Sequence, residues 1–363
     1  MAQDPSMVIK YWGVRGSIPA PLTSKELRER NLALIGQILD DGGTERIFKG
    51  RKARQKTIEK YLDSLPFHLV DTYGGDTSCI EIQARGTPLI IVDAGTGLRH
   101  LGNDMMGRLF SNQHFNPISS DYTTKREIHM LFSHYHWDHI QGFPFFVPSF
   151  LTGENKVTMH FYGKLDAIKH LEEVLRGQQM HPNFPVRWDE LACEKKYHEI
   201  GRLEPKTNIL GLTTINHCEL DHPDSVLAYR FDIDRVSFVY ASDTEHRDSP
   251  DPGLVKLAKG ADILYYDTQY TPGEYRGEPG SITGPVSKFR WGHSTFEWAI
   301  RTGLAAGVNL VVGGHLEPAR TDKGVYELER EANKFLDQQL RLPENAGKTM
   351  RFMMGYQGLE QRL

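Results

Sequence analysis

The chain has 363 residues, of which 39% are hydrophobic and 25% are charged, as is typical of a globular protein with an apolar core. Its net charge is −4 at pH 7, which argues against a general nucleic-acid binder, because such proteins are usually strongly basic. The three cysteines, Cys79, Cys193 and Cys218, are too widely spaced to predict a disulfide framework or a thiolate metal site. They favour a reducing compartment.

The N-terminal segment lacks the apolar core of a signal peptide, and no apolar run approaches the roughly 18 residues of a membrane span. We therefore expect a cytoplasmic protein that makes no membrane contact. Residues 1–6 (MAQDPS) look like a tag remnant, which makes Met7 the expected native start. Residues 7–363 are expected to form a single domain.

Strand-like segments recur along the whole chain, each rich in Val, Ile, Tyr or Phe and bounded by Gly, Pro or Asp. In chain order, the clearest are residues 7–13, 79–84, 88–95, 127–134, 156–163, 211–217, 226–233, 235–243, 262–268 and 308–315. Helical patterns lie between them. Many strands interleaved with helices predict an α/β sandwich covered by helices.

A helical insertion is predicted near the N-terminus, at about residues 21–70, with its helices at 24–40 and 52–62. It contains a basic run, FKGRKARQKTIEKY (48–61). A solvated helix face is the favoured interpretation of this run, and a docking site for a nucleotide or RNA is the alternative.

The best-marked helix covers residues 295–306. Ser294 is expected to cap it, because Glu297 lies three residues later and completes a capping box. Gly307 is a suitable residue to close its C-terminus.

Several strands end on a side chain that is able to bind a metal ion. Functional groups of α/β sheets gather at strand ends, so a single site is able to collect residues that are distant in sequence. The strand-end residues are Asp93, His134, Asp243, Asp267 and His315.

The segment LFSHYHWDHIQG (131–142) places three histidines and an aspartate within six positions. Imidazole and carboxylate suit zinc, manganese and iron. If the segment is extended, His134 and His136 point the same way, because side chains repeat with period two. Asp138 and His139 follow a turn and can reach a second ion. A chance cluster and a closed structural zinc site are the alternatives, and closed sites favour cysteine.

Two ions need more ligands than this segment holds. His222 follows a turn and precedes a strand, although His217 is a rival five residues earlier. Asp243 is able to bridge two ions through its two oxygens, which leaves room for a shared water. The predicted ligands are His134, His136 and His222 for one ion, Asp138, His139 and His315 for the other, and Asp243 between them.

The H-x-H-x-D-H pattern resembles the motif of the metallo-β-lactamase fold hydrolases, and the resemblance runs from about residue 8 to 317. The stretches YWGVRGSIPAP, YGGDTSCIEI and DAGTGLRHLG are similar to a bacterial branch close to the ribonuclease Z-like phosphodiesterases. The resemblance implies an αββα four-layer sandwich with two divalent metals at one edge of the β-layers, zinc or manganese, with iron also suitable. It also implies that Asp93 orients a ligand histidine, whereas residue chemistry alone equally favours a helix cap.

The stretch RWGHSTFEWAIRTGLAAGVNLVVGGH (290–315) is similar to a His-Ser-Thr-helix-strand-His pattern of the phosphodiesterase branch. The resemblance implies that His293 lies near the metals and acts on the phosphate or the leaving group. An alkoxide leaves poorly unless a proton arrives. Simple pairing of His293 with the helix end is the alternative. Asp138, as acceptor of a proton from the attacking water, and His293 are the predicted catalytic residues.

Residues around the site are weaker candidates for substrate contacts. Phe143 and Phe184 are candidates to stack a base, although core packing is the favoured role for most of the aromatic residues near the site. Asp267 and Tyr270 lie near a strand end and are assigned to the substrate pocket or to the support of the ligands.

These observations predict a dinuclear metal-dependent phosphodiesterase. A 3′,5′-cyclic nucleotide is the first predicted substrate, because the chain is acidic and lacks an evident RNA-gripping arm. The alternative is an endoribonuclease that processes transfer-RNA 3′ ends, with RNA as the partner. A carboxylic ester, lactone or β-lactam hydrolase would use the same metals without His293, and a metal-binding sensor without turnover is least favoured. A homodimer is expected from the family alone.

Overall fold

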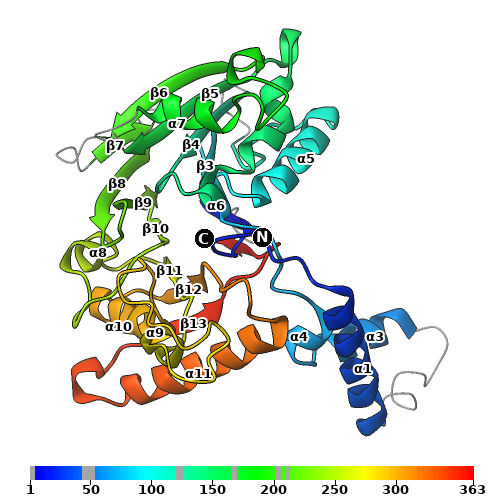
Figure 1. The fold of residues 1–363 in the computed structure, drawn as a ribbon, viewed down its shortest axis with the longest axis vertical. Coiled ribbons are helices and arrows are strands. Elements are labelled where there is room, and N and C mark those ends of the chain that lie inside the picture. The colour runs from blue at the N-terminus through cyan, green and yellow to red at the C-terminus, as the bar shows by residue number, and fades with distance from the viewer. Residues whose placement is uncertain (1–4, 43–53, 120–125, 165–169, 201–205, 210–212) are drawn as a thin grey trace.

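The computed structural model describes residues 5–42, 54–119, 126–164, 170–200, 206–209 and 213–363. Two seven-stranded sheets lie face to face (Figure 1). Each sheet is antiparallel at one end and parallel at the other, with the parallel pairs running from β3 to β6 in the first sheet and from β10 to β13 in the second.

The first sheet has the strand order β14-β1-β2-β3-β4-β5-β6. Its strands are β1 (Met7–Gly13), β2 (Cys79–Ala84), β3 (Leu89–Val92), β4 (Glu127–Leu131), β5 (Thr158–Lys164), β6 (Glu194–Ile200) and β14 (Glu360–Arg362). The second sheet has the order β13-β12-β11-β10-β9-β8-β7. Its strands are β7 (Lys206–Ile209), β8 (Thr213–Leu220), β9 (Val226–Ile233), β10 (Val236–Ala241), β11 (Ile263–Asp267), β12 (Leu310–Gly314) and β13 (Arg351–Met354).

Helices cover the outer faces of both sheets. The α-helices are α1 (Ser24–Asp40), α3 (Arg54–Leu62), α4 (Phe67–Val70), α5 (Gly97–Phe110), α6 (Trp137–Ile140), α7 (Leu171–Gln178), α8 (Pro252–Leu257), α9 (Pro272–Arg276), α10 (Phe296–Ala306) and α11 (Asp322–Leu340). Short 3-10 helices are η2 (Phe143–Phe145), η3 (Val147–Phe150), η4 (Gly153–Asn155), η5 (Trp188–Glu190) and η6 (Pro343–Asn345). Helices α5 and α7 contact the first sheet, and α8, α10 and α11 contact the second.

Alternation along the strands divides the apolar residues between two layers. Ile82 and Val92 of the first sheet share one core with Phe231 of the second, because strand side chains point to opposite faces in turn. Ile91 and Met130 point the other way and pack under the outer helices. The predicted αββα four-layer sandwich is therefore confirmed.

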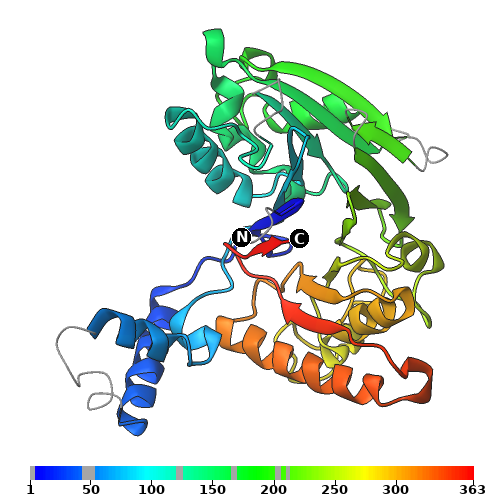
Figure 2. The same cartoon turned by 180° about the vertical axis from the view of Figure 1, so that it is seen from behind.

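The predicted insertion contains α1, α3 and α4, and α4 connects it to α11. Figures 1 and 2 show α1 and α3 projecting from the body beside α11. A capping box between Thr23 and Glu26 starts α1. Residues 48–53 of the basic run lie outside the described residues, whereas Lys56 and Lys60 on α3 are exposed to solvent.

The predicted start and N-cap of the helix at 295–306 differ from the structure. Helix α10 begins at Phe296 with Thr295 as its N-cap, and no side chain caps it. The predicted Ser294 cap is wrong because the Ser294 hydroxyl pairs with His246 Nδ1 at 3.0 Å instead.

None of the helices within the described ranges combines the length and the apolarity that a membrane crossing demands.

Candidate metal centre

The strand-end residues meet at one edge of the sandwich, because parallel strands bring their carboxyl ends to the same side. Asp93 follows β3, Asp243 follows β10 and His315 follows β12. All three have left-handed backbones, with φ of 60°, 52° and 53°. Residues other than glycine rarely adopt this conformation, which costs on the order of 1–3 kcal/mol each. The surrounding fold must therefore hold these side chains in place.

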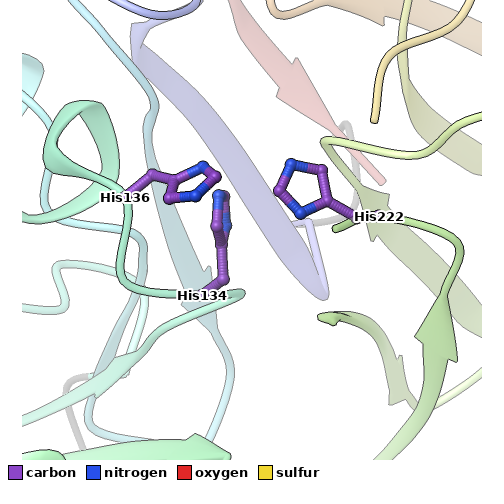
Figure 3. A group of neighbouring side chains, drawn as sticks. All are labelled: His134, His136 and His222. Atoms are coloured by element: carbon purple, nitrogen blue, oxygen red, sulfur yellow. The ribbon is translucent and has the colours of Figure 1, made fainter. Parts of the chain in front are cut away.

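One ligand group comes from two loops. His134 and His136 lie between β4 and α6, and His222 lies between β8 and β9. Their ligand nitrogens fall within 4.8 Å of one another, and Figure 3 shows the three rings converging. The rival His217 lies on β8 and joins none of the metal-competent groups found among the described residues.

The second group contains Asp138, His139 and His315. Asp138 Oδ2 lies 3.3 Å from His139 Nε2 and 3.1 Å from His315 Nε2. Asp138 and His139 are on the one-turn helix α6, which turns them away from His136 and toward β12.

Asp243 lies between the two groups. Its Oδ2 is 3.1 Å from His139 Nε2, while its Oδ1 is 3.1 Å from His315 Nε2 and 3.9 Å from His134 Nε2. The Nε2 atoms of His134 and His139 are buried and have no hydrogen-bond partner. Buried polar atoms without a partner are rare and call for an explanation. Two divalent ions fit this donor set, and they would occupy the space that these lone pairs face.

Asp93 orients His139 of the second group through a buried hydrogen-bond network. Its carboxylate is fully buried and accepts hydrogen bonds from the Ser133 N–H and hydroxyl, both at 2.8 Å, and from the Tyr240 hydroxyl at 2.7 Å. It also pairs with His139 Nδ1 at 2.8 Å. With the proton on Nδ1, His139 presents a bare Nε2 to the centre. Asp93 is not the cap of α5, whose N-cap is Thr96.

Burial and charge set the protonation of the ligands. Burial lowers the pKa of His134 well below its ordinary value and that of His222 to about 4, so both rings are neutral. Burial also acts to lower the pKa of His315, but the carboxylates of Asp243 and Asp138 outweigh it and raise the pKa to about 9. The carboxylates around His315 therefore favour a positive charge at this position.

His293 lies beside the ligand set with its ring 13% exposed. Its Nδ1 pairs with Asp267 Oδ2 at 2.8 Å and lies 3.7 Å from Asp243 Oδ1. The fully buried Asp267 therefore orients His293, and the ring stacks on His315 with the centroids 4.8 Å apart. Tyr270 is nearly buried, and its ring centroid is 6.0 Å from that of His293.

The aromatic predictions divide in two. Phe143 is fully buried against Phe161 and Trp188, at centroid distances of 5.5 and 5.0 Å. Phe143 therefore takes the favoured core-packing role and not the base-stacking one, because α6 and η2 turn the ring into the core. Phe184 packs edge-to-face on the exposed Phe145 at 5.5 Å, so this pair lies at the surface.

Sequence reasoning missed several residues that hold the ligands. The Ser17 N–H donates to Asp138 Oδ2 at 2.8 Å, and Gln269 Oε1 pairs with His315 Nδ1 at 3.0 Å. Asp224 Oδ2 pairs with His136 Nε2 at 2.7 Å. The closeness of Gln269 to Asp267 in the chain was one available signal.

A loop before His293 is tied down by Glu245, which was also missed. The Glu245 carboxylate accepts hydrogen bonds from the N–H groups of Arg290 (2.6 Å) and Gly292 (3.0 Å) and from the Tyr275 hydroxyl (2.6 Å). Gly292 has φ of +86°, and a Cβ there would lie 2.1 Å from His222 Cδ2. The loop therefore passes directly over a ligand, where only glycine fits.

Two exposed tryptophans flank the centre. Trp137 lies between two ligands in the chain and is 81% exposed, and Trp291, two residues before His293, is 49% exposed.

Comparison with known proteins places this geometry in context. Residues 89–316 match the model of the β-lactamase superfamily domain. Ribonuclease Z of Staphylococcus carnosus (strain TM300) is 25% identical over 154 residues, which cover 41% of this chain and 46% of that protein. The chain thus matches about half the length of this relative.

Two solved structures share the fold along almost the whole chain. The metallo-β-lactamase fold protein YhfI from Bacillus subtilis has a TM-score of 0.56 and 15% identity, covering 99% of this chain and 100% of its own. Unliganded yeast PDE1 has a TM-score of 0.54 and 13% identity, with the same coverage. At these identities the likeness shows the fold alone.

Proposed function

The chain belongs to the metallo-β-lactamase superfamily, and from that premise we propose that it is a two-metal hydrolase of phosphodiesters. One observation carries the proposal. His293, held by the buried Asp267, lies beside the shared ligand Asp243, on neither of the two predicted ligand sets. An alkoxide on phosphorus leaves poorly unless a proton arrives, and His293 is a group that can supply this proton.

Seven residues would hold the metals, namely His134, His136, Asp138, His139, His222, Asp243 and His315. When bound, two such ions lower the pKa of a water and polarise the phosphoryl oxygen. Zinc, manganese and iron all suit these ligands.

Asp138 has the role of orienting the attacking water. Its Oδ2 is held by the Ser17 N–H and by His315. Burial acts to raise the pKa of Asp138, but His139 and His315 hold it below the ordinary range. A carboxylate with a pKa this low is a weak base, so it does not keep a proton that it accepts from the water and passes it on.

His293 has the role of assisting the leaving oxygen. With the Nδ1 proton donated to Asp267, the doubly protonated ring carries its second proton on Nε2, and that proton is the one passed to the leaving oxygen. The same ring is able to donate a hydrogen bond to a non-bridging phosphate oxygen, which gives it a second use before the bond breaks.

A 3′,5′-cyclic nucleotide is the first proposed substrate. Trp137 and Trp291 offer exposed rings beside the centre, and nucleobases stack on such rings with about 1–3 kcal/mol per base. The net charge of −4 also favours a small ligand over a long polyanion. A cytoplasmic location and a homodimer stay predictions.

The second candidate is a transfer-RNA 3′-processing endoribonuclease. The match to ribonuclease Z of S. carnosus supports this candidate. Both candidates break the same kind of bond, a phosphodiester. It predicts affinity for RNA that falls steeply with salt, because phosphate contacts release counterions.

Turnover of 3′,5′-cyclic AMP and of a 3′-extended transfer RNA, with zinc and then with manganese, separates the candidates. Cleavage of the cyclic nucleotide alone, lost in His293→Ala while the metal content is unchanged, supports the first. Cleavage at the RNA 3′ extension moves the second to first place. Hydrolysis of an ester or lactone that does not depend on His293, with neither phosphodiester cleaved, overturns the phosphodiester assignment.

A further inference from the structure

A second group of histidines lies on the first sheet, away from the metal centre. His129 on β4 and His160 on β5 are register partners, and Glu127 is on β4 two residues before His129. His129 precedes the ligand His134 by five positions, so at about 3.3 Å per extended residue the two groups are roughly 16 Å apart. None of these three residues belongs to the site described above.

Their ligand atoms already have distances close to those of a coordination site. The rings of His129 and His160 are stacked, with centroids 4.3 Å apart and planes within 8°. Glu127 Oε1 lies 2.8 Å from His160 Nε2 and 3.9 Å from His129 Nε2. Bonds of about 2.1 Å to a tetrahedral zinc separate its ligands by about 3.4 Å, which is between these two values.

The opposite nitrogen of each ring is held by a partner. His129 Nδ1 pairs with the Tyr162 hydroxyl at 3.0 Å, and His160 Nδ1 pairs with His198 Nε2 at 3.0 Å. Partners at the second nitrogen orient metal-binding histidines and keep the first nitrogen bare. The arrangement therefore points both Nε2 atoms toward the same carboxylate.

The two imidazole Nε2 atoms of this group lack hydrogen bonds of good geometry. The Nε2 atoms of His129 and His160 are buried without a hydrogen-bond partner, and the His129 side chain is only 2% exposed. Burial lowers the pKa of His129 to about 2 and also lowers that of His160, so both rings are neutral. Neutral, desolvated imidazoles beside a carboxylate form a donor set that suits a metal cation.

We propose that Glu127, His129 and His160 form a further metal site, separate from the dinuclear centre, that takes one Zn²⁺ with water as its fourth ligand. Two imidazoles and a carboxylate are a common zinc donor set. The parallel rings must tilt toward a common point when the ion binds, so the stack opens slightly. The ion would link β4 to β5 near the start of both strands.

Metal content tests the proposal without any use of turnover. After dialysis against zinc and gel filtration, we expect three zinc ions per wild-type chain by mass spectrometry. We expect two in His129→Gln, with phosphodiesterase activity unchanged. His170→Gln is the matched control, because His170 also pairs with a glutamate near β6 but is exposed, and it should keep all three. Two ions in the wild type overturn the proposal.

A spectroscopic measurement protects the test against misfolding of the variant. In a His134→Ala/His222→Ala/His139→Ala/His315→Ala background both predicted ligand sets of the dinuclear centre lose two histidines, so Co²⁺ should bind once per chain with the visible absorption of a tetrahedral site. Adding His160→Gln should abolish that absorption. Absence of the band before His160→Gln is introduced, in a folded protein, rules the site out, whatever the substrate of the enzyme.

Discussion

Replacing Asp93 by asparagine removes one negative charge from the floor of the metal centre and leaves the shape of the side chain unchanged. Asp93 Oδ2 receives three partners, the Ser133 hydroxyl, His139 Nδ1 and the Tyr240 hydroxyl, at 2.7–2.8 Å. Asp93 Oδ1 accepts the Ser133 N–H at 2.8 Å. An asparagine that keeps this backbone bond must turn its NH₂ group toward the other three partners.

The hydroxyls adapt to this change and His139 does not. A hydroxyl rotates from donor to acceptor at little cost, but His139 Nδ1 accepts a proton only if its own moves to Nε2. Nε2 is the atom that faces Asp138 and Asp243, and a protonated Nε2 cannot bind a metal. Loss of such a supporting partner typically weakens metal binding 10–100-fold, or about 1.4–2.7 kcal/mol.

Competition with a chromophoric chelator measures this affinity directly. The control is Asp262→Asn, because Asp262 also accepts a backbone N–H, that of Ser237 at 2.9 Å, at the start of β11. The control should bind metal as the wild type does. If Asp93→Asn retains wild-type affinity within twofold, the tautomer explanation for Asp93 is refuted.

Three further predictions concern the loop over the centre and the residues next to it. Gly292→Ala should lose metal, because its Cβ would lie 2.1 Å from the His222 ring. The control Gly280→Ala, with a similar φ of +89° and open space around it, should lose only a little stability. Equal metal contents in the two variants would contradict this prediction. Glu245→Gln weakens the acceptor of two backbone N–H groups, so we expect a several-fold lower kcat at unchanged fold, and an unaltered kcat would count against it. Burial lowers the pKa of His246 to about 4, below the unfolded value near 6.5, so its contribution to stability is complete above pH 6.5 and is lost as the pH falls toward 4. The Tm of the wild type should therefore drop more steeply in this window than that of His246→Gln, and parallel profiles would disprove it.

The fold and the residues that gather at the candidate metal centre could be predicted from the sequence because their signals are local. His134, His136, Asp138 and His139 occupy six positions, and Asp243 and His315 each end an apolar strand. The αββα arrangement followed from the resemblance of those motifs and is confirmed by the two facing sheets.

The missed residues act through contacts that no sequence pattern encodes. Ser17 contributes its backbone N–H to Asp138 across 121 positions, so its side-chain type carries no signal. The Ser294 cap failed because His246, 48 positions earlier, takes its hydroxyl. The sequence left the roles of Phe143 and Phe145 open, because only the packing of η2 decides which of the neighbouring aromatic rings enters the core.

The left-handed backbones of Asp93, Asp243 and His315 bear on how this protein would respond to laboratory evolution. A glycine at Asp243 or His315 relieves backbone strain, so a screen for thermal stability alone rewards loss of a candidate ligand. At Asp93 the gain is outweighed, because glycine would leave the buried partners Ser133, His139 and Tyr240 unpaired. A screen for turnover opposes the loss of a candidate ligand. Thermostable variants selected without an activity assay should therefore accumulate changes at Asp243 and His315 first, and a stabilised library would have to be challenged with substrate in every round to keep its metals.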